Sequence, residues 1–458
     1  MAVDRSRLPA PGPDPQFRFP RIARHTLRNG LKLRTVEHPG VPVVTVAMQI
    51  NGGLGADPPA REGLASMTAD MVDEGTGSLS AIDVSDALAR IGAEYDVEVG
   101  ADVTMFTLTT LARFAVRGAA LLSDMLTAPS MRTSDFERIR QLRLDRLRQL
   151  KDLPPAVAER AFLQLLYPSH PYGHLAIGSD ASLRELTLEE VVRFHKATFV
   201  PCRATLVMVG ALSHGNLVTL AEEAFGTWNG AGAAGDVPPA AADVTPAPAS
   251  EGRLAIVPRE GAAQSELRIG HLSARRDTPD YAPLLVMNAI LGGQFVSRIN
   301  LKLREEKAFT YGVRTGFDWR RGLGPFAVQT SVHTAATAES IADTLQEISA
   351  LRGDRPATPQ EMSLAQASLT RGYPRNFETA QQVARSVSQL ALFDLPDSYF
   401  EEFVPKVNAV TAGEVTRVAR TYLDPSRAIA LVVGDRTATE QSLDALGRGE
   451  LHVLPPTG

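Results

Sequence analysis

The chain has 458 residues, of which 44% are hydrophobic and 22% are charged, and its formal net charge is −5 at pH 7. A single hydrophobic core rarely grows beyond about 250–300 residues, so this length predicts more than one domain. The near balance of 47 basic and 52 acidic residues, without a basic tract, argues against nucleic acid as a partner. The single cysteine, Cys202, excludes an internal disulfide framework and any cysteine-based zinc site.

The chain begins MAVDRSRLPAPGPDPQ, which is rich in Pro and lacks the apolar core of a secretory signal. Residues 1–19 are therefore predicted to form a disordered leader. No run approaches the roughly 18–20 apolar residues of a membrane span, so no membrane span is expected. The expected location is the cytoplasm, with the periplasm open if a signal peptide has been removed.

Apolar, β-branched segments recur along the chain and alternate with helical stretches. This alternation predicts an α+β fold with substantial helix content. The strands are expected, in chain order, within residues 31–38, 41–50, 103–111, 253–258, 265–272 and 326–333. A longer helix is expected from Ser134, read as its N-cap with Glu137 completing a capping box. Its apolar stripe would be Phe136, Ile139, Leu142, Leu147 and Leu150.

An internal repeat relates residues 186–211 to residues 410–435, with a constant offset of 224 residues and no gap. In each copy a Thr and a Glu three residues later form the pattern of a capping box. Each helix is followed by a Pro that cannot continue it, and then by an apolar run that ends at Gly. The fold class predicted is therefore two homologous α+β domains, each a mostly antiparallel sheet packed with helices.

The segment 228–248 is rich in Ala, Gly and Pro and has the composition of a linker. It places the domain boundaries at 20–229 for the N-terminal domain, 230–251 for the linker and 252–458 for the C-terminal domain.

Four patterns together resemble the pitrilysin/insulinase family of metallopeptidases, in particular the branch that includes the mitochondrial processing peptidase. They are LRNGLKLRTVEHPGVPVVTVAMQINGG with the following EGLASMTADMVDEGT, then SHPYGHLAIGS, the repeated strand unit VVRFHKATFVPCRATLVMVGAL at 191–212, and LGGQFVSRINLKLREEKAFTYGV at 291–313. The resemblance spans about residues 25–435, and the duplication fits the family's two similar domains.

The resemblance implies a zinc motif that this sequence lacks. Catalytic members carry His-x-x-Glu-His on a helix, where the two His bind zinc and the Glu activates water. Here those positions hold Ser66, Ala69 and Asp70. The family's two glutamates on the later helix fall at Ile139 and Arg146. Since a catalytic zinc needs about three protein ligands, no metal site and no cofactor are expected in this chain.

The resemblance also implies that Arg304 and Tyr311, in LREEKAFTY, match an Arg and a Tyr of the second domain that bind the substrate backbone. A guanidinium and a phenol can donate hydrogen bonds to carbonyl oxygens and to a developing oxyanion. The alternative reading is a surface ion pair of Arg304 with Glu305 or Glu306, and core packing for Tyr311.

Other candidate residues favour structural roles. His170 and His174 are four apart, but Pro171 and Gly173 prevent the helix that would align them. His195 lies on an amphipathic helix. A carboxylate patch of Asp70, Asp73 and Glu74 reads better as a solvated helix end, and the glycines at 292–293 lack the Lys-Ser/Thr of a phosphate loop.

The resulting hypothesis is a non-catalytic subunit of a heterodimeric zinc metallopeptidase, a hydrolase complex that degrades or processes peptides. A homologous partner would supply zinc on its own His-x-x-Glu-His, and this chain, inactive alone, would supply Arg304 and Tyr311. The alternative is an inert scaffold protein descended from the same family. An independent hydrolase with a relocated site finds no supporting constellation.

Overall fold

The computed structural model describes residues 17–230 and 253–455. Of the predicted linker, residues 230–251, only Gly230 is among the described residues, and the predicted leader lies outside them up to residue 16. Phe17 and Phe19 are described, and they pack against the ring of Phe377 with centroid distances of 4.8 and 5.2 Å. The leader boundary at residue 19 was therefore wrong, because these two rings find apolar partners.

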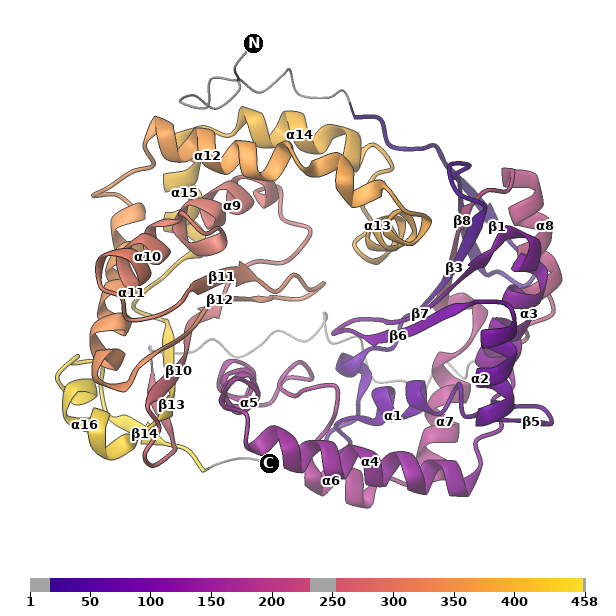
Figure 1. Ribbon diagram of the computed structural model, residues 1–458, viewed down its shortest axis with the longest axis horizontal. Helices are drawn as coiled ribbons and strands as arrows, with labels where there is room; N and C mark the ends of the chain where they lie inside the picture. Colours follow the sequence, from indigo (N-terminus) through magenta and orange to yellow (C-terminus); the bar gives the residue numbers. More distant parts are fainter. Residues whose placement is uncertain (1–16, 231–252, 456–458) are drawn as a thin grey trace, which may run out of the picture.

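The N-terminal half forms a six-stranded sheet in the order β1-β2-β8-β3-β7-β6 (Figure 1). Neighbouring strands are antiparallel except for the parallel pair β2 and β8. A two-stranded hairpin, β4 (Gly75–Thr76) and β5 (Leu79–Ser80), lies apart from it. The strands of the sheet are β1 (Ile22–Thr26), β2 (Lys32–Glu37), β3 (Val43–Ile50), β6 (Glu94–Val99), β7 (Thr104–Leu111) and β8 (Ala204–Gly210).

The C-terminal half forms a second six-stranded sheet in the order β11-β12-β10-β13-β9-β14. The pairs of β9 with β13 and with β14 are parallel, and the other pairs are antiparallel. Five adjacent strands therefore repeat the order and directions of β6-β7-β3-β8-β2, which confirms the predicted duplication. The strands are β9 (Leu254–Pro258), β10 (Gln264–Leu272), β11 (Val313–Phe317), β12 (Pro325–His333), β13 (Ile429–Gly434) and β14 (Leu451–Val453).

Helices cover both sheets, and the predicted α+β class with two homologous domains is confirmed. The helices of the N-terminal half are α1 (Leu64–Asp70), α2 (Ala81–Arg90), α3 (Ala115–Thr127), α4 (Thr133–Lys151), α5 (Pro154–Leu166), α6 (Asp180–Glu185), α7 (Leu188–Thr198) and α8 (His214–Phe225). Those of the C-terminal half are α9 (Tyr281–Asn288), α10 (Arg298–Asn300), α11 (Thr337–Leu351), α12 (Pro359–Thr370), α13 (Ala380–Leu392), α14 (Tyr399–Ala409), α15 (Ala412–Tyr422) and α16 (Arg436–Asp444), with π-helical turns η5 (Ala289–Gly293) and η6 (Leu301–Glu306).

The repeated unit folds the same way twice. α7 and α15 each begin at a Thr whose hydroxyl accepts from the backbone N–H three residues on, at 3.2 Å in both copies. The matching Glu carboxylate accepts from the Thr backbone N–H in return, so both predicted capping boxes are present. β8 and β13 then run as buried strands at the centre of their sheets.

The predicted start of α4 was wrong. The helix begins at Thr133, so Ser134 lies inside its first turn and caps nothing. Glu137 pairs with Arg140 on the same helix instead of completing a capping box. Leu142 is 54% exposed and does not belong to the buried stripe, which Leu144 joins instead.

Each half also packs one helix on the other half's sheet. Val157 and Phe162 of α5 lie in one apolar cluster with Ile429 and Val433 of β13. Reciprocally, Val383 and the rest of α13's apolar face pack on β3 and β8. This exchange buries both inner sheet faces and joins the two halves.

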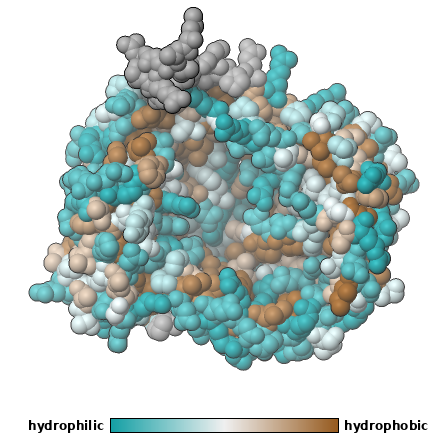
Figure 2. Space-filling model, in the orientation of Figure 1, coloured by the Kyte–Doolittle hydropathy of each residue, from teal (hydrophilic) through white to brown (hydrophobic). Residues whose placement is uncertain are grey.

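The two halves stand opposite one another in Figure 1, with α5 and α13 between the sheets. The face shown in Figure 2 is hollowed at its centre, between these halves.

One helical stretch, Tyr281–Glu306, is long and apolar enough to cross a membrane by length and composition alone. However, 61% of its most apolar window is buried inside the protein, as in a core helix.

Candidate functional site

The degenerate motif lies on α1, a seven-residue helix that begins after Gly63. Gly63 has a φ of 92°, and a Cβ there would lie 2.9 Å from Gly178, so the tight approach of the two loops requires glycine. The Asp57 carboxylate accepts from the backbone N–H groups of Gly63 and Ala65, both at 2.7 Å. These bonds satisfy amides at the start of α1 and fix the helix that carries the motif.

Two of the three motif positions contact an arginine of α4. Arg143 donates from Nε to Asp70 Oδ2 at 2.8 Å and from Nη2 to Ser66 Oγ at 2.5 Å. Its Nη1 lies 3.4 Å from the carbonyl oxygen of Ile177. Ala69, at the position of the catalytic glutamate, is completely buried and brings no polar atom. A guanidinium thus bridges the two positions at which catalytic relatives are expected to hold zinc.

Sequence reasoning missed Arg143. The sequence pattern that could have identified it is its spacing: Arg143 lies four residues after Ile139 and four before Leu147, on the apolar face of α4. Such a position buries a charge, and a buried guanidinium requires an acceptor. Asp70, the one carboxylate in the degenerate motif, is that acceptor.

The two positions aligned with the family's glutamates, Ile139 and Arg146, carry no carboxylate that could bind a metal at the motif. Ile139 is buried in an apolar cluster with Met67 of α1. Arg146 is exposed and donates from Nη1 to Gln149 on its own helix at 3.2 Å. Within the part of the chain that the structure describes, no group of three His, Cys, Asp or Glu side chains could hold a metal ion. The donor set at the motif, one hydroxyl and one carboxylate with a cation between them, does not fit zinc.

This chemistry leads to the first prediction. The purified chain is expected to hold no stoichiometric zinc and to cleave no peptide by itself. Replacing only Ser66→His, Ala69→Glu and Asp70→His should not restore activity, because Ile139 and Arg146 still supply no third ligand. Metal analysis after mild dialysis tests this, and about one zinc per wild-type chain would contradict it.

The three histidines considered from the sequence have hydrogen-bond partners on the backbone. His170 is buried, and its Nδ1 accepts from the Tyr172 N–H at 3.1 Å. His174 Nδ1 lies 3.1 Å from the Leu175 carbonyl oxygen. His195 Nε2 lies 2.9 Å from the Leu126 carbonyl oxygen, which fits a packing role.

The remaining sequence candidates have local partners. Glu74 pairs with Arg138, and burial together with the neighbouring Glu74 raises the pKa of Asp73 to about 6. The two glycines at 292–293 lie in η5, where a Cβ on Gly292 would meet the Thr315 side chain at 2.3 Å. Close helix packing, rather than phosphate binding, explains Gly292.

Arg304 lies at the end of η6 and folds back on the preceding turn. Its guanidinium carbon stands 3.2 Å from the ring centroid of Phe295, and Nη2 donates to the Phe295 carbonyl oxygen at 3.2 Å. Nε donates to Glu305 at 2.9 Å, so the ion pair considered as an alternative is present. Nη1 is buried without a hydrogen-bond partner among the described residues, so one N–H group of the guanidinium makes no hydrogen bond.

Tyr311 projects from the turn between η6 and β11, and it is 91% exposed. Core packing of Tyr311, the alternative considered for it, was therefore wrong. Asn300 fixes the turn from one side by exchanging two hydrogen bonds of 2.8 Å with the backbone of Val313. On the other side Thr310 Oγ1 donates to the Gly312 carbonyl oxygen at 3.0 Å. The phenol is thus presented on a backbone that the core holds in place.

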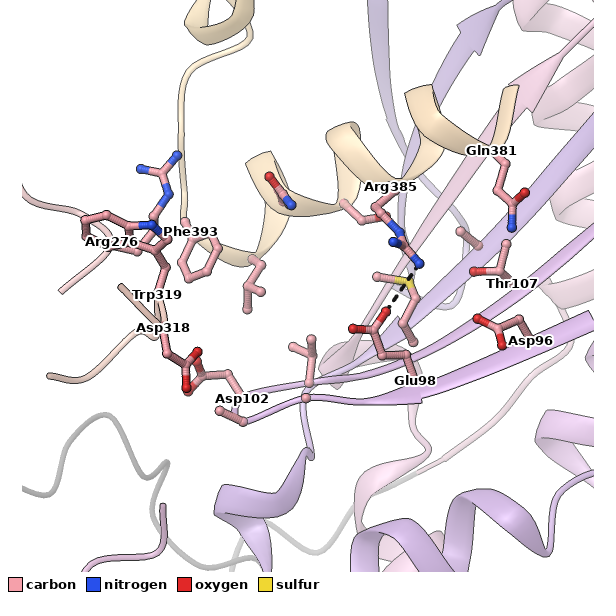
Figure 3. Close-up of a pocket in the computed structure, with 18 of the residues that line it drawn as sticks. Asp96, Glu98, Asp102, Thr107, Arg276, Asp318, Trp319, Gln381, Arg385 and Phe393 are labelled. Carbon is pink, nitrogen blue, oxygen red and sulfur yellow. Dashed lines mark hydrogen bonds and ion pairs between the residues drawn. The ribbon is translucent and has the colours of Figure 1, made fainter. Parts of the chain in front are cut away.

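A cavity of about 430 Å³ lies between β6, β7 and α13, at the junction of the two halves (Figure 3). Glu98 of β6 faces Arg385 of α13 at 3.4 Å, but both side chains are about two-thirds exposed, so this pair stabilises little. Asp96 lies beside them, while Asp318 and Trp319 close the far wall. The lining residues do not include the motif on α1, Arg304 or Tyr311.

β6 is the outer strand of its sheet and pairs only with β7 within the described residues. Its other edge therefore offers backbone N–H and C=O groups to an added strand. A sheet edge of this kind can take up an extended chain as an additional strand.

A second prediction concerns pH. Burial raises the pKa of Asp57 to about 7; the N–H bonds from Ala65 and Gly63 oppose this rise, Glu62 adds to it and Arg143 opposes it. Because the carboxyl has a pKa of about 3.9 in the unfolded chain, the folded state holds the proton more tightly. The unfolding free energy contributed by Asp57 should therefore fall as pH rises from about 4 to about 7.

The Asp57→Asn variant should lose this fall, because Asn does not titrate. Urea denaturation at several pH values measures the slope. The matched control is Asp83→Asn, since the hydroxyl and backbone of Ser80 lower the pKa of Asp83 and give a pH dependence of opposite sign. Identical slopes for wild type and Asp57→Asn would contradict the raised pKa.

The fold and the site together define a duplicated α+β peptidase-type chain whose metal-binding positions have been replaced. Two family models match adjacent parts of the chain: "Insulinase (Peptidase family M16)" matches residues 33–178 and "Peptidase M16 inactive domain" matches residues 185–369. The chain belongs to the insulinase family, peptidase family M16. The resemblance drawn from the sequence is confirmed.

Relatives of known sequence agree with this assignment. An "Uncharacterized zinc protease" of Mycobacterium bovis is 24% identical over 425 residues, which are 92% of this chain and 96% of the relative. The "Probable mitochondrial-processing peptidase subunit beta" of Schizosaccharomyces pombe is 26% identical over 208 residues, 45% of this chain and 46% of that protein.

Solved structures share the fold. The peptidase M16 inactive domain from Pseudomonas fluorescens superposes with a TM-score of 0.82 at 22% identity, covering 90% of this chain and 98% of the other. A protease from Helicobacter pylori superposes with a TM-score of 0.83 at 17% identity, covering 90% and 99%.

Proposed function

We propose that this chain is the non-catalytic subunit of a heterodimeric zinc metallopeptidase that degrades or processes peptides. A homologous subunit with an intact His-x-x-Glu-His supplies the zinc and the general base. This chain supplies Arg304 and Tyr311 to the active site that the two subunits form together, and it carries out no hydrolysis alone.

The main support for this proposal is that the first half has lost its metal-binding residues while the second half keeps Arg304 and Tyr311. In the first half the motif positions hold Ser66, Ala69 and Asp70, and Arg143 already engages two of them. In the second half the Arg and Tyr remain at the family spacing, and the phenol of Tyr311 is held out into solvent. Loss of the metal-binding residues, together with a retained Arg304 and an exposed Tyr311, supports a division of labour between two subunits.

The substrate we propose is an extended peptide of limited size. The unpaired edge of β6 supports binding by strand addition, in which backbone hydrogen bonds provide affinity without demanding one sequence. Arg304 and Tyr311 then donate to peptide carbonyl oxygens and stabilise the charge that develops at the scissile carbonyl.

The partner is expected among homologous chains encoded beside this one. Co-purification tests the proposal: the two chains should elute together as a 1:1 complex with about one zinc per pair, held by the partner. One observation favours the scaffold alternative: Arg304 donates from Nε to Glu305, so this N–H group is not free to bind a peptide. Complex formation without any dependence of hydrolysis on this chain would support the scaffold and contradict the proposal.

A further inference from the structure

Arg143 is a buried cation, 8% exposed, whose guanidinium lies between Ser66 and Asp70. Its guanidinium reaches three segments of the N-terminal half: α4 from which it projects, α1 through the two motif side chains, and the loop that contains Ile177. A metal bound by α1 and α4 would connect the same two helices. The arginine therefore connects the two helices that such a metal would connect.

We propose that the Arg143 guanidinium is a built-in cation that takes the place of zinc and excludes divalent metal from the motif. An arginine side chain stays charged at every pH at which proteins are studied. A dication placed between α1 and α4 would meet this positive charge within a few ångströms, in a partly buried place where like charges repel strongly. The site is thus closed to metal by an added charge as well as by lost ligands.

This inference differs from simple ligand loss in what it expects when the ligands return. The restored chain carries Ser66→His, Ala69→Glu, Asp70→His and Arg146→Glu, which supplies the family's three ligands and base. If ligand loss were the whole cause, the restored chain would bind zinc. If Arg143 also blocks the site, the restored chain should bind zinc at least about 100-fold more weakly than the same chain that also carries Arg143→Gln.

The experiment is equilibrium dialysis with zinc, followed by metal analysis of the protein. Arg143→Gln keeps an N–H donor for position 66 and removes the charge. The matched control is Arg148→Gln in the restored chain, because Arg148 lies on the same helix with its side chain 62% exposed. The inference expects zinc gain from Arg143→Gln and none from Arg148→Gln. Equal zinc affinity of the restored chain with and without Arg143 would overturn it.

Thermal melting keeps the test decisive if a variant folds poorly. In the wild-type motif, Arg143→Gln leaves Asp70 without its cation and should lower the melting temperature. The restored chain no longer contains Asp70, so there the comparison is between melting temperatures with and without zinc. Zinc should raise the melting temperature of the restored chain that also carries Arg143→Gln, because the metal then connects α1 and α4, and it should raise that of the restored chain with Arg143 much less. An equal rise in both chains would contradict the claim that the guanidinium excludes the metal.

Discussion

In the complex with a catalytic partner, Arg304→Ala or Tyr311→Phe is expected to lower kcat by about 100-fold, while assembly and the partner's zinc stay intact. Each side chain donates to the oxygen on which negative charge develops, and a 100-fold loss corresponds to about 2.7 kcal/mol of transition-state stabilisation. The change in kcat identifies an interaction made in the transition state. A rise of KM at constant kcat would instead assign the two residues to holding the peptide backbone.

The matched control for Arg304 is Arg314→Ala. Arg314 is exposed on β11, ten residues along the chain and outside the LREEKAFTY segment. Its removal changes the net charge equally and should leave kcat within about twofold, because surface substitutions away from a site have small effects. Full activity of the Arg304→Ala, Tyr311→Phe double variant, with the complex still eluting as a dimer, would remove both residues from the mechanism.

The second large effect concerns stability. Phe162→Ala is expected to lower the free energy of unfolding by about 3–5 kcal/mol, the usual cost of removing a buried aromatic side chain. Phe162 is 2% exposed on α5, and it packs in the apolar cluster that includes β9 and β13 of the C-terminal half. Urea denaturation measures the change, and the loss should appear in the unfolding of both halves.

Gln164→Ala serves as its control, because Gln164 lies on the same helix and is exposed. That variant should stay within about 0.5 kcal/mol of wild type. A Phe162→Ala chain as stable as the control would contradict the packing of α5 on the second sheet.

Local patterns predicted the elements well because their causes are local. The capping boxes at Thr187 and Thr411 depend on residues three positions apart, and both are formed. The strands depend on apolar runs that must be buried, and all six predicted strands are present. The start of α4 was missed, since the backbone enters the helix one residue before Ser134 without any side-chain cap.

Contacts between distant segments could not be predicted in the same way. The sequence of α5 predicts an apolar face but not which surface buries it, because any apolar surface of the protein could do so. In the structure it covers the sheet of the other half. Similarly, the loss of metal ligands at Ser66 and Asp70 was visible in the sequence, but the guanidinium between them was not. Arg143 is 73 residues from Asp70, and only the packing of α4 on α1 brings them together.

The central claim is that this chain completes an active site whose zinc belongs to another subunit. The most direct measurement is hydrolysis of a quenched fluorescent peptide by a fixed amount of the partner, with this chain added in increasing amounts. The account predicts no hydrolysis by either chain alone and a rate that rises until one chain is present per partner. A partner that reaches the same rate without this chain, or a complex that forms and stays inactive, would contradict it.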